Sequence, residues 1–152
     1  MKKILLSLLG CMVLSTTTAA HAVEKNDILG VWLNQEKDAK IEIYQCQEKY
    51  CGKIVWLKEP EYPPDSKDGI PGTPKLDHHN PDEALRKVPV IGLQIVHGLT
   101  YAGKGRWKKG KIYDPKNGKT YSAKIKLVDL HKLDRRGYIG ISLIGRTATW
   151  TR

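Results

Sequence analysis

The stretch from Ile112 to Leu127, IYDPKNGKTYSAKIKL, decides the fold class. Its second half alternates apolar and polar residues with a period of two, the apolar ones being Tyr121, Ala123, Ile125 and Leu127. Such alternation is typical of a strand with one buried face. The residues before it, Asp-Pro-Lys-Asn-Gly at 114–118, form turns readily, because proline restricts φ and Asn-Gly tolerates positive φ. We therefore expect an antiparallel hairpin with a strand over Lys119–Leu127.

Similar segments fill most of the chain. About eight short β-like stretches are separated by Gly, Pro, Asn and Asp, and apolar residues at helical spacing are almost absent. Alternation predicts further strands over Ile139–Leu143 and Thr147–Thr151, and Asp134-Arg135-Arg136-Gly137 is predicted to be a turn between Leu133 and Tyr138. Consecutive hairpins close readily into a barrel, so we expect an all-β fold, an antiparallel β-barrel or strongly curved sheet.

Cys46 and Cys51 bracket four residues in this β-like region. In an exported protein such a pair indicates a disulfide, here across a hairpin in which the two cysteines face each other. That register brings apolar residues together, pairing Ile43 with Ile54 and Ile41 with Trp56, and Tyr44 with Lys53 on the other face. The alternatives are two free thiols or half of a metal site.

The segment from Lys58 to Pro81 differs from the rest, since it carries six of the eight prolines. It is followed by the signal for one short helix ending near Lys87, with Asn80 as N-cap, Pro81 in the first position and Glu83 in the third. A connection this long is often a lid or binding loop. The alternative is a cap over one open end of the barrel.

The N-terminus has the features of a signal peptide. Lys2 and Lys3 precede an apolar run over residues 4–14, and Ala20-His21-Ala22 is the small-x-small pattern of a cleavage site. We expect cleavage before Val23, which places the protein in the periplasm or outside the cell.

The remaining residues, 23–152, suffice for one domain. An alternative is that Leu8-Leu9-Gly10-Cys11 acts as a lipobox, with Cys11 lipidated. We favour the signal peptide of residues 1–22, because the apolar run before Cys11 is very short for a leader.

The chain is basic, with a formal net charge of +10. This charge favours anionic partners, such as an anionic membrane surface or an acidic small molecule. Much of it also fits the solvated face of a sheet. We expect no nucleic-acid partner, because no recognition helix or matching motif is present.

Residues for metal binding or catalysis are few. His78 and His79 are weak metal candidates, since adjacent histidines seldom chelate one ion unaided. No serine or cysteine lies in a nucleophile motif with a histidine. We therefore expect no catalytic residue and no cofactor, although carboxylates brought together from distant strands would escape this reasoning.

The chain has four tryptophans, Trp32, Trp56, Trp107 and Trp150, seven tyrosines and no phenylalanine. Aromatic rings with a polar edge can line a ligand pocket. The alternative is that they fill the core, and we expect this for Trp32 and Trp150.

Gly30-Val31-Trp32 resembles the Gly-x-Trp motif that opens the first strand of lipocalins and related calycins. This resemblance implies that Trp32 packs against an arginine of the closing strand, either Arg146 or Arg152.

The wider sequence resembles a family of small exported bacterial proteins described as a domain of unknown function. The resemblance covers nearly all of residues 23–152 and implies a lipocalin-like fold, with no activity to carry over. It rests on residues 40–44, 50–56, 80–82, 112–121 and 136–150.

These observations favour a monomeric binding protein of the cell envelope that holds a small apolar or anionic amphipathic ligand. One alternative is an interaction module whose basic face docks on an anionic membrane or an envelope protein, and another is a hydrolase-type enzyme at the barrel mouth. The candidate ligand-binding residues are Trp32, Tyr44, Trp56, Trp107, Asn80, Asp82, Arg86 and Arg146.

Overall fold

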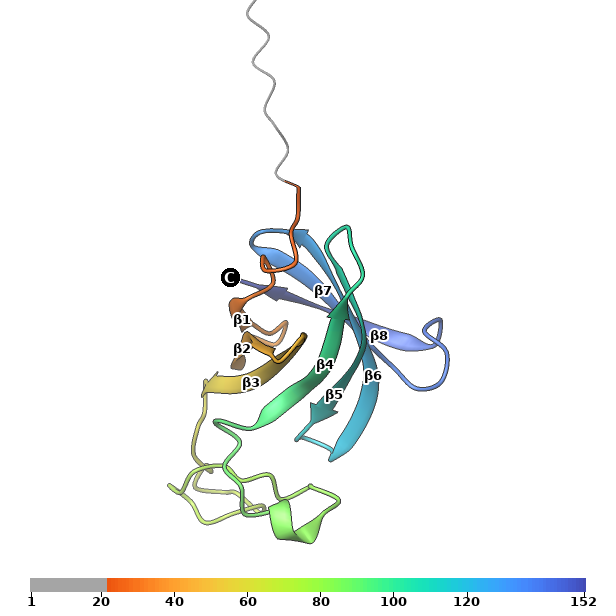
Figure 1. Ribbon diagram of the computed structural model, residues 1–152. Coiled ribbons are helices and arrows are strands. Elements are labelled where there is room, and N and C mark those ends of the chain that lie inside the picture. The colour runs from red at the N-terminus through yellow and green to blue at the C-terminus, as the bar shows by residue number, and fades with distance from the viewer. Residues whose placement is uncertain (1–21) are drawn as a thin grey trace, which may run out of the picture.

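The computed structural model describes residues 22–152, which form a closed antiparallel barrel of eight strands with one turn of 3-10 helix. Each strand pairs with the next along the chain, and β8 closes on β1 (Figure 1). The all-β barrel is thus confirmed, while the predicted signal peptide lies, except for Ala22, outside the described residues. The elements are β1 (Gly30–Leu33), β2 (Ala39–Cys46), β3 (Lys49–Leu57), η1 (Glu83–Leu85), β4 (Gln94–Tyr101), β5 (Arg106–Asp114), β6 (Lys119–Asp129), β7 (Lys132–Tyr138) and β8 (Gly145–Thr151).

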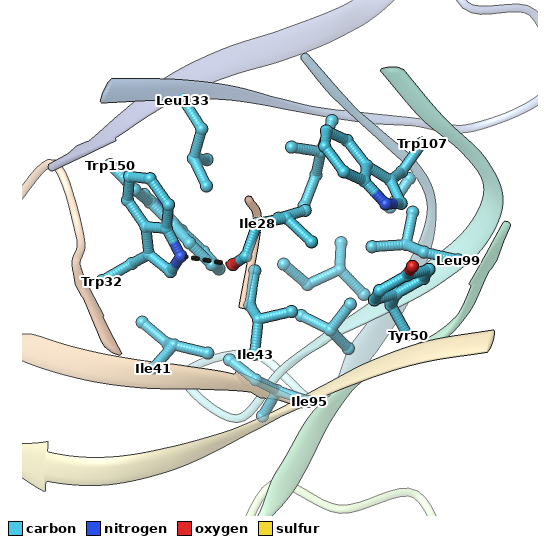
Figure 2. Packing of buried hydrophobic residues seen from close by; sticks show 14 of the residues in the cluster. Ile28, Trp32, Ile41, Ile43, Tyr50, Ile95, Leu99, Trp107, Leu133 and Trp150 are labelled. Carbon is cyan, nitrogen blue, oxygen red and sulfur yellow. Dashed lines mark hydrogen bonds between the residues drawn. The ribbon is translucent and has the colours of Figure 1, made fainter. Parts of the chain in front are cut away.

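One end of the barrel is filled by side chains. Trp32, Trp107, Leu99 and Leu133 are fully buried there, and Ile28 enters from the segment that precedes β1 (Figure 2). The indole Nε1 of Trp32 donates a hydrogen bond of 2.8 Å to the carbonyl oxygen of Ile28, which holds that segment in place. The core therefore fills the end of the barrel against which the segment before β1 packs.

The hairpin predicted around residues 114–118 is confirmed. Its strands are β5 and β6, and the amides of Asn117 and Gly118 both donate to the carbonyl oxygen of Asp114. Gly118 has a φ of 68°, and a β-carbon at this position would collide with the carbonyl oxygen of His79. The turn needs glycine both for its conformation and for contact with the long connection between β3 and β4.

The disulfide between Cys46 and Cys51 is confirmed, with Cα atoms 5.8 Å apart, but the predicted register is wrong by two residues. The turn contains only Gln47 and Glu48, so Cys46 pairs with Lys49 and the disulfide runs diagonally. The observed pairs are Ile43 with Gly52, Ile41 with Ile54 and Tyr44 with Cys51. A bulge next to Ile41 then pairs Trp56 with Lys40, which leaves 38% of the tryptophan exposed.

Two predictions near the C-terminus are wrong. Asp134-Arg135-Arg136-Gly137 lies inside β7, and the turn between β6 and β7 falls instead at Leu130 and His131. The predicted strand at Ile139–Leu143 is an exposed loop between β7 and β8. The strand predicted over Thr147–Thr151 is confirmed within β8.

The long connection between β3 and β4, residues 58–93, crosses the end of the barrel opposite the filled core (Figure 1). Its predicted helix is reduced to η1, and the N-cap is Asp82, not Asn80. The Asp82 carboxylate accepts from the amide of Ala84, whereas Asn80 is engaged with the buried Asp77. Among residues 22–152, no helix is long and apolar enough to cross a membrane.

Candidate functional site

A cavity of about 1000 Å³ lies between the barrel wall and the 58–93 connection. Its inner part is aliphatic, since Ile41, Ile54, Ile95 and Ile112 come from four consecutive strands and are all buried. They occupy inward positions of the alternating strand pattern, so the same period that forms the sheet also forms the wall. This surface suits the apolar part of a small ligand.

Aromatic side chains complete the wall. Trp150 of β8 and Tyr121 of β6 line it from the barrel, and Tyr62 lines it from the long connection. Trp150 is only 2% exposed in total, so the cavity touches a small part of its ring. The cavity therefore combines aliphatic and aromatic surfaces in one hollow.

Arg135 is a cation on this mostly apolar wall. It lies on β7 opposite Ala148, and its guanidinium carbon is 5.8 Å from the centre of the Trp150 ring. Its Nε atom is buried and lacks a hydrogen-bond partner, and within residues 22–152 no carboxylate lies within 4.0 Å of the guanidinium. Burial lowers the pKa of Arg135, while the more distant carboxylates of Glu36 and Asp114 raise it. Arginine nevertheless stays charged, so the cavity holds a positive group that is poorly solvated.

The 58–93 connection is fastened to the barrel through Asp77, which is fully buried. The hydroxyl of Tyr113 on β5 donates a hydrogen bond of 2.6 Å to one carboxylate oxygen, and Asn80 Nδ2 donates one of 2.7 Å to the other. Burial and the carboxylate of Asp77 raise the pKa of Tyr113 well above its ordinary value. These hydrogen bonds hold the 58–93 connection, which forms one wall of the cavity, against the barrel.

At the rim, two turns of the barrel are joined by an ion pair. Lys116 Nζ donates to Asp38 Oδ2 at 2.7 Å, and both residues line the cavity. Burial alone would raise the pKa of Asp38, but hydrogen bonds from Lys116 and Asn34 outweigh it and hold that pKa below its ordinary value. The ion pair ties the β1–β2 and β5–β6 turns together beside the opening.

His78 and His79 line the cavity, with ring centres 4.0 Å apart. His78 Nδ1 lies 3.2 Å from the carbonyl oxygen of Leu76, and its Nε2 lies 3.8 Å from a carboxylate oxygen of Asp68. In the part of the chain that the structure describes, no three His, Cys, Asp or Glu residues are grouped to hold a metal ion.

Four of the predicted ligand-binding residues are aromatic, and none of these four lines the cavity. Trp32 and Trp107 belong to the filled core. Tyr44 and Trp56 project outwards, where Lys53 and Lys40 lie over their rings. Aromatic character alone did not distinguish the cavity wall from the core or the outer face.

The four polar candidates also lie away from the cavity wall. Asn80 holds Asp77, Asp82 caps η1, and Arg86 donates from Nε to the carbonyl oxygen of Asn80 at 2.8 Å. These three stabilise the long connection. Arg146 is exposed on β8.

The charged residue of the cavity wall that the sequence candidates omit is Arg135, which the sequence pattern places in a turn. The available signal was its spacing of two from Leu133, which places both side chains on the inner face of β7. The neighbouring charges and Gly137 obscured that signal, because such a cluster also fits a turn.

The comparisons with known proteins agree with this architecture. Residues 30–152 match the model of a family described as "Uncharacterized protein conserved in bacteria (DUF2147)". The chain belongs to the DUF2147 family. A solved structure, HP1028 from Helicobacter pylori, is described as belonging to the lipocalin family, and it is similar to this DUF2147 protein with a TM-score of 0.68. The two share 25% identity over 82% of each chain, and no curated protein matches this one significantly. The fold of this DUF2147 protein is lipocalin-like.

Proposed function

We propose that this protein is an exported binding protein of the cell envelope that holds a small amphiphile in its barrel cavity, with an anionic head group against Arg135. Three observations support the proposal: the volume of the cavity, its aliphatic inner wall and the unpartnered cation on that wall. The leader sequence and the disulfide support export.

Arg135 is the observation that carries the proposal. A poorly solvated charge without a partner is costly. Arg135 is half-buried, and it gains neither a hydrogen bond at its buried Nε nor an ion pair within 4.0 Å among residues 22–152. A carboxylate or phosphate in the cavity would pair with the planar guanidinium, and this geometry favours two parallel hydrogen bonds. The alkyl chain of such a ligand would extend along Ile41, Ile54 and Ile112.

The hydrolase alternative finds less support. It needs a serine or carboxylate within hydrogen-bond distance of a histidine in a cleft. Across residues 22–152, His78 and Asp68 form the histidine–carboxylate pair within 4.0 Å. The distance from His78 Nε2 to Asp68 Oδ1 is 3.8 Å, which is too long for a hydrogen bond. Ser66 Oγ instead accepts from the backbone amide of Asp68.

The test compares two probes that share an alkyl chain, dodecanoate and dodecanol, by isothermal titration. We expect dodecanoate to bind at least about tenfold more tightly, because only the carboxylate can pair with Arg135. Arg135→Met keeps the apolar volume and should remove that preference, while Lys132→Met, an exposed position on the same strand, should keep it.

Native mass spectrometry of protein purified gently from the periplasm provides a second readout. Extra mass that disappears on denaturation would reveal the class of the natural ligand. If wild type and Arg135→Met prefer dodecanoate equally, or if neither probe enters the cavity, the proposal is wrong.

A further inference from the structure

The loop between β7 and β8, residues 139–144, exposes four large aliphatic side chains next to one another. The exposed fractions are 70% for Ile139, 61% for Ile141, 88% for Leu143 and 73% for Ile144. Figure 1 shows this loop projecting away from the barrel. Soluble proteins seldom gather so many apolar side chains at one exposed tip, so this loop is a candidate contact surface.

The loop is held in a defined shape by Arg136 of β7. Arg136 Nε donates to the carbonyl oxygen of Ser142 at 2.7 Å, and Nη2 donates to that of Leu143 at 3.0 Å. Nη1 reaches Thr147 on β8 at 3.0 Å, so the guanidinium joins the loop to both strands. The apolar tip is therefore presented by a braced turn.

A hollow of about 350 Å³ on the outer face of the neighbouring strands collects positive charge. Arg106 lies opposite Lys126 across β5 and β6, and Lys124 lies opposite Arg136 across β6 and β7. Like charges that face each other across strands are unfavourable. The cations on the wall of this hollow are Arg106, Lys108, Lys124, Lys126 and Arg136.

These five cations have no ion-pair partner within 4.0 Å in the described part of the chain. Asp134 also lines the hollow, opposite Lys126 across β6 and β7, and its carboxylate accepts a hydrogen bond from Thr149. The wall of the hollow therefore carries five cations and one anion. Anions supplied from outside would relieve the repulsion between the facing cations.

We propose that the 139–144 loop and the cation-lined hollow together dock the protein on a bilayer that contains anionic phospholipids. The aliphatic side chains would enter the interfacial region, and the cations would contact lipid phosphates. The charge decides between a membrane and a second copy of the chain, because two copies would bring like-charged faces together.

Topology relates this surface to the cavity. In a barrel of consecutive antiparallel strands, the β7–β8 loop lies at the same end as the β3–β4 connection, which covers the cavity. Because the cation-lined hollow lies on the outer face of β5–β7, however, a protein docked through both the loop and the hollow would lay this side of the barrel against the membrane. The docking proposal stands without the proposed ligand, and Arg135→Met should bind vesicles like wild type.

Vesicle flotation tests the proposal with protein produced from the full-length chain, whose mass is measured first to show whether residues 1–22 remain. Wild type should float with vesicles of phosphatidylethanolamine and phosphatidylglycerol, should be released by high salt, and should not float with phosphatidylcholine alone. The double variant Ile141→Ser and Leu143→Ser should bind at least about tenfold more weakly. Both positions are exposed, so the fold should survive, as circular dichroism can verify.

The matched control is Val128→Ser with Leu130→Ser, which removes two exposed apolar side chains at the other end of the barrel and should leave flotation unchanged. Lys124→Gln with Lys126→Gln should weaken binding and its salt dependence. Absence of flotation by wild type would overturn the proposal, as would equal binding by the loop variant and its control. A third outcome would also overturn the proposal. If wild type does not bind vesicles but sediments as a dimer, and only the loop substitutions make it a monomer, the loop serves self-association.

Discussion

The guanidinium carbon of Arg152 lies 4.2 Å from the centre of the Trp32 indole ring. The two residues come from opposite ends of the barrel sequence, and they meet at the seam where β8 pairs with β1 at a single position. Arg152 also donates hydrogen bonds to the carbonyl oxygens of Leu29 at 2.7 Å and Asp27 at 2.8 Å. This arginine therefore fastens the segment before β1 to the closing strand.

Replacing Arg152 should weaken the seam. Arg152→Ala removes the cation–π contact and the charged hydrogen bonds, and we expect it to lower the free energy of unfolding by about 2 kcal/mol. Urea denaturation measures this change. Arg146→Ala, at an exposed position on β8, should change stability by less than about 0.5 kcal/mol. Equal effects of the two substitutions would show that the seam does not depend on Arg152.

The disulfide should stabilise the β2–β3 hairpin modestly. Cys46→Ser with Cys51→Ser reopens a short loop, and the chain-entropy model predicts a loss of about 2 kcal/mol in the free energy of unfolding. Reduction of the wild-type protein should reproduce most of this loss in the same denaturation experiment. If the double variant is as stable as wild type, the constraint contributes nothing to the folded state.

Tyr113 and Asp77 should control how firmly the 58–93 connection is attached. Tyr113→Phe leaves a buried carboxylate with one donor fewer, so we expect a loss of about 2 kcal/mol and faster hydrogen exchange in residues 75–92. The control is Tyr121→Phe, whose hydroxyl accepts a 3.3 Å bond from the exposed Asn117. Unchanged exchange in Tyr113→Phe would mean that other contacts hold the connection.

The Asp38–Lys116 ion pair predicts a pH dependence. Asp38 ionises at lower pH in the folded protein than in the unfolded chain, so its stabilising effect is present above the ordinary carboxyl range. The effect is lost as the pH falls through the lowered pKa. Lys116→Met should cost less than about 1 kcal/mol at neutral pH, because the pair is largely exposed. The difference from wild type should shrink below about pH 4, as denaturation at several pH values can show. A difference that is constant with pH would contradict this assignment.

The β5–β6 hairpin could be predicted from the sequence because its strand and its turn are specified by neighbouring residues. The period of two over Lys119–Leu127 and the turn residues 114–118 need no distant partner to take effect. The β2–β3 register was harder, since a shift of two residues keeps every side chain on the same face. The apolar pattern therefore fits the predicted and the observed pairing equally well, and the diagonal position of the Cys46–Cys51 disulfide separates them.

Long-range packing explains the errors near the C-terminus. Asp134–Gly137 has the composition of a turn, yet it is a strand because β6 and β8 pair with it on both sides. The alternation over Ile139–Leu143 resembles a strand, yet no partner strand lies beside it. A pattern of alternating residues indicates a possible strand, and only a neighbouring strand makes it one.

The sequence by itself determined the all-β class, a lipocalin-like barrel by resemblance, the disulfide and the proline-rich connection. Those features follow from short-range periodicity, turn chemistry and residue composition. Only the tertiary structure decided that Arg152 and not Arg146 covers Trp32, that Arg135 faces the cavity, and that residues 139–144 form an exposed apolar tip. The physical reason is that the surroundings of these side chains depend on which distant strands pair with one another. A short stretch of sequence does not contain that information.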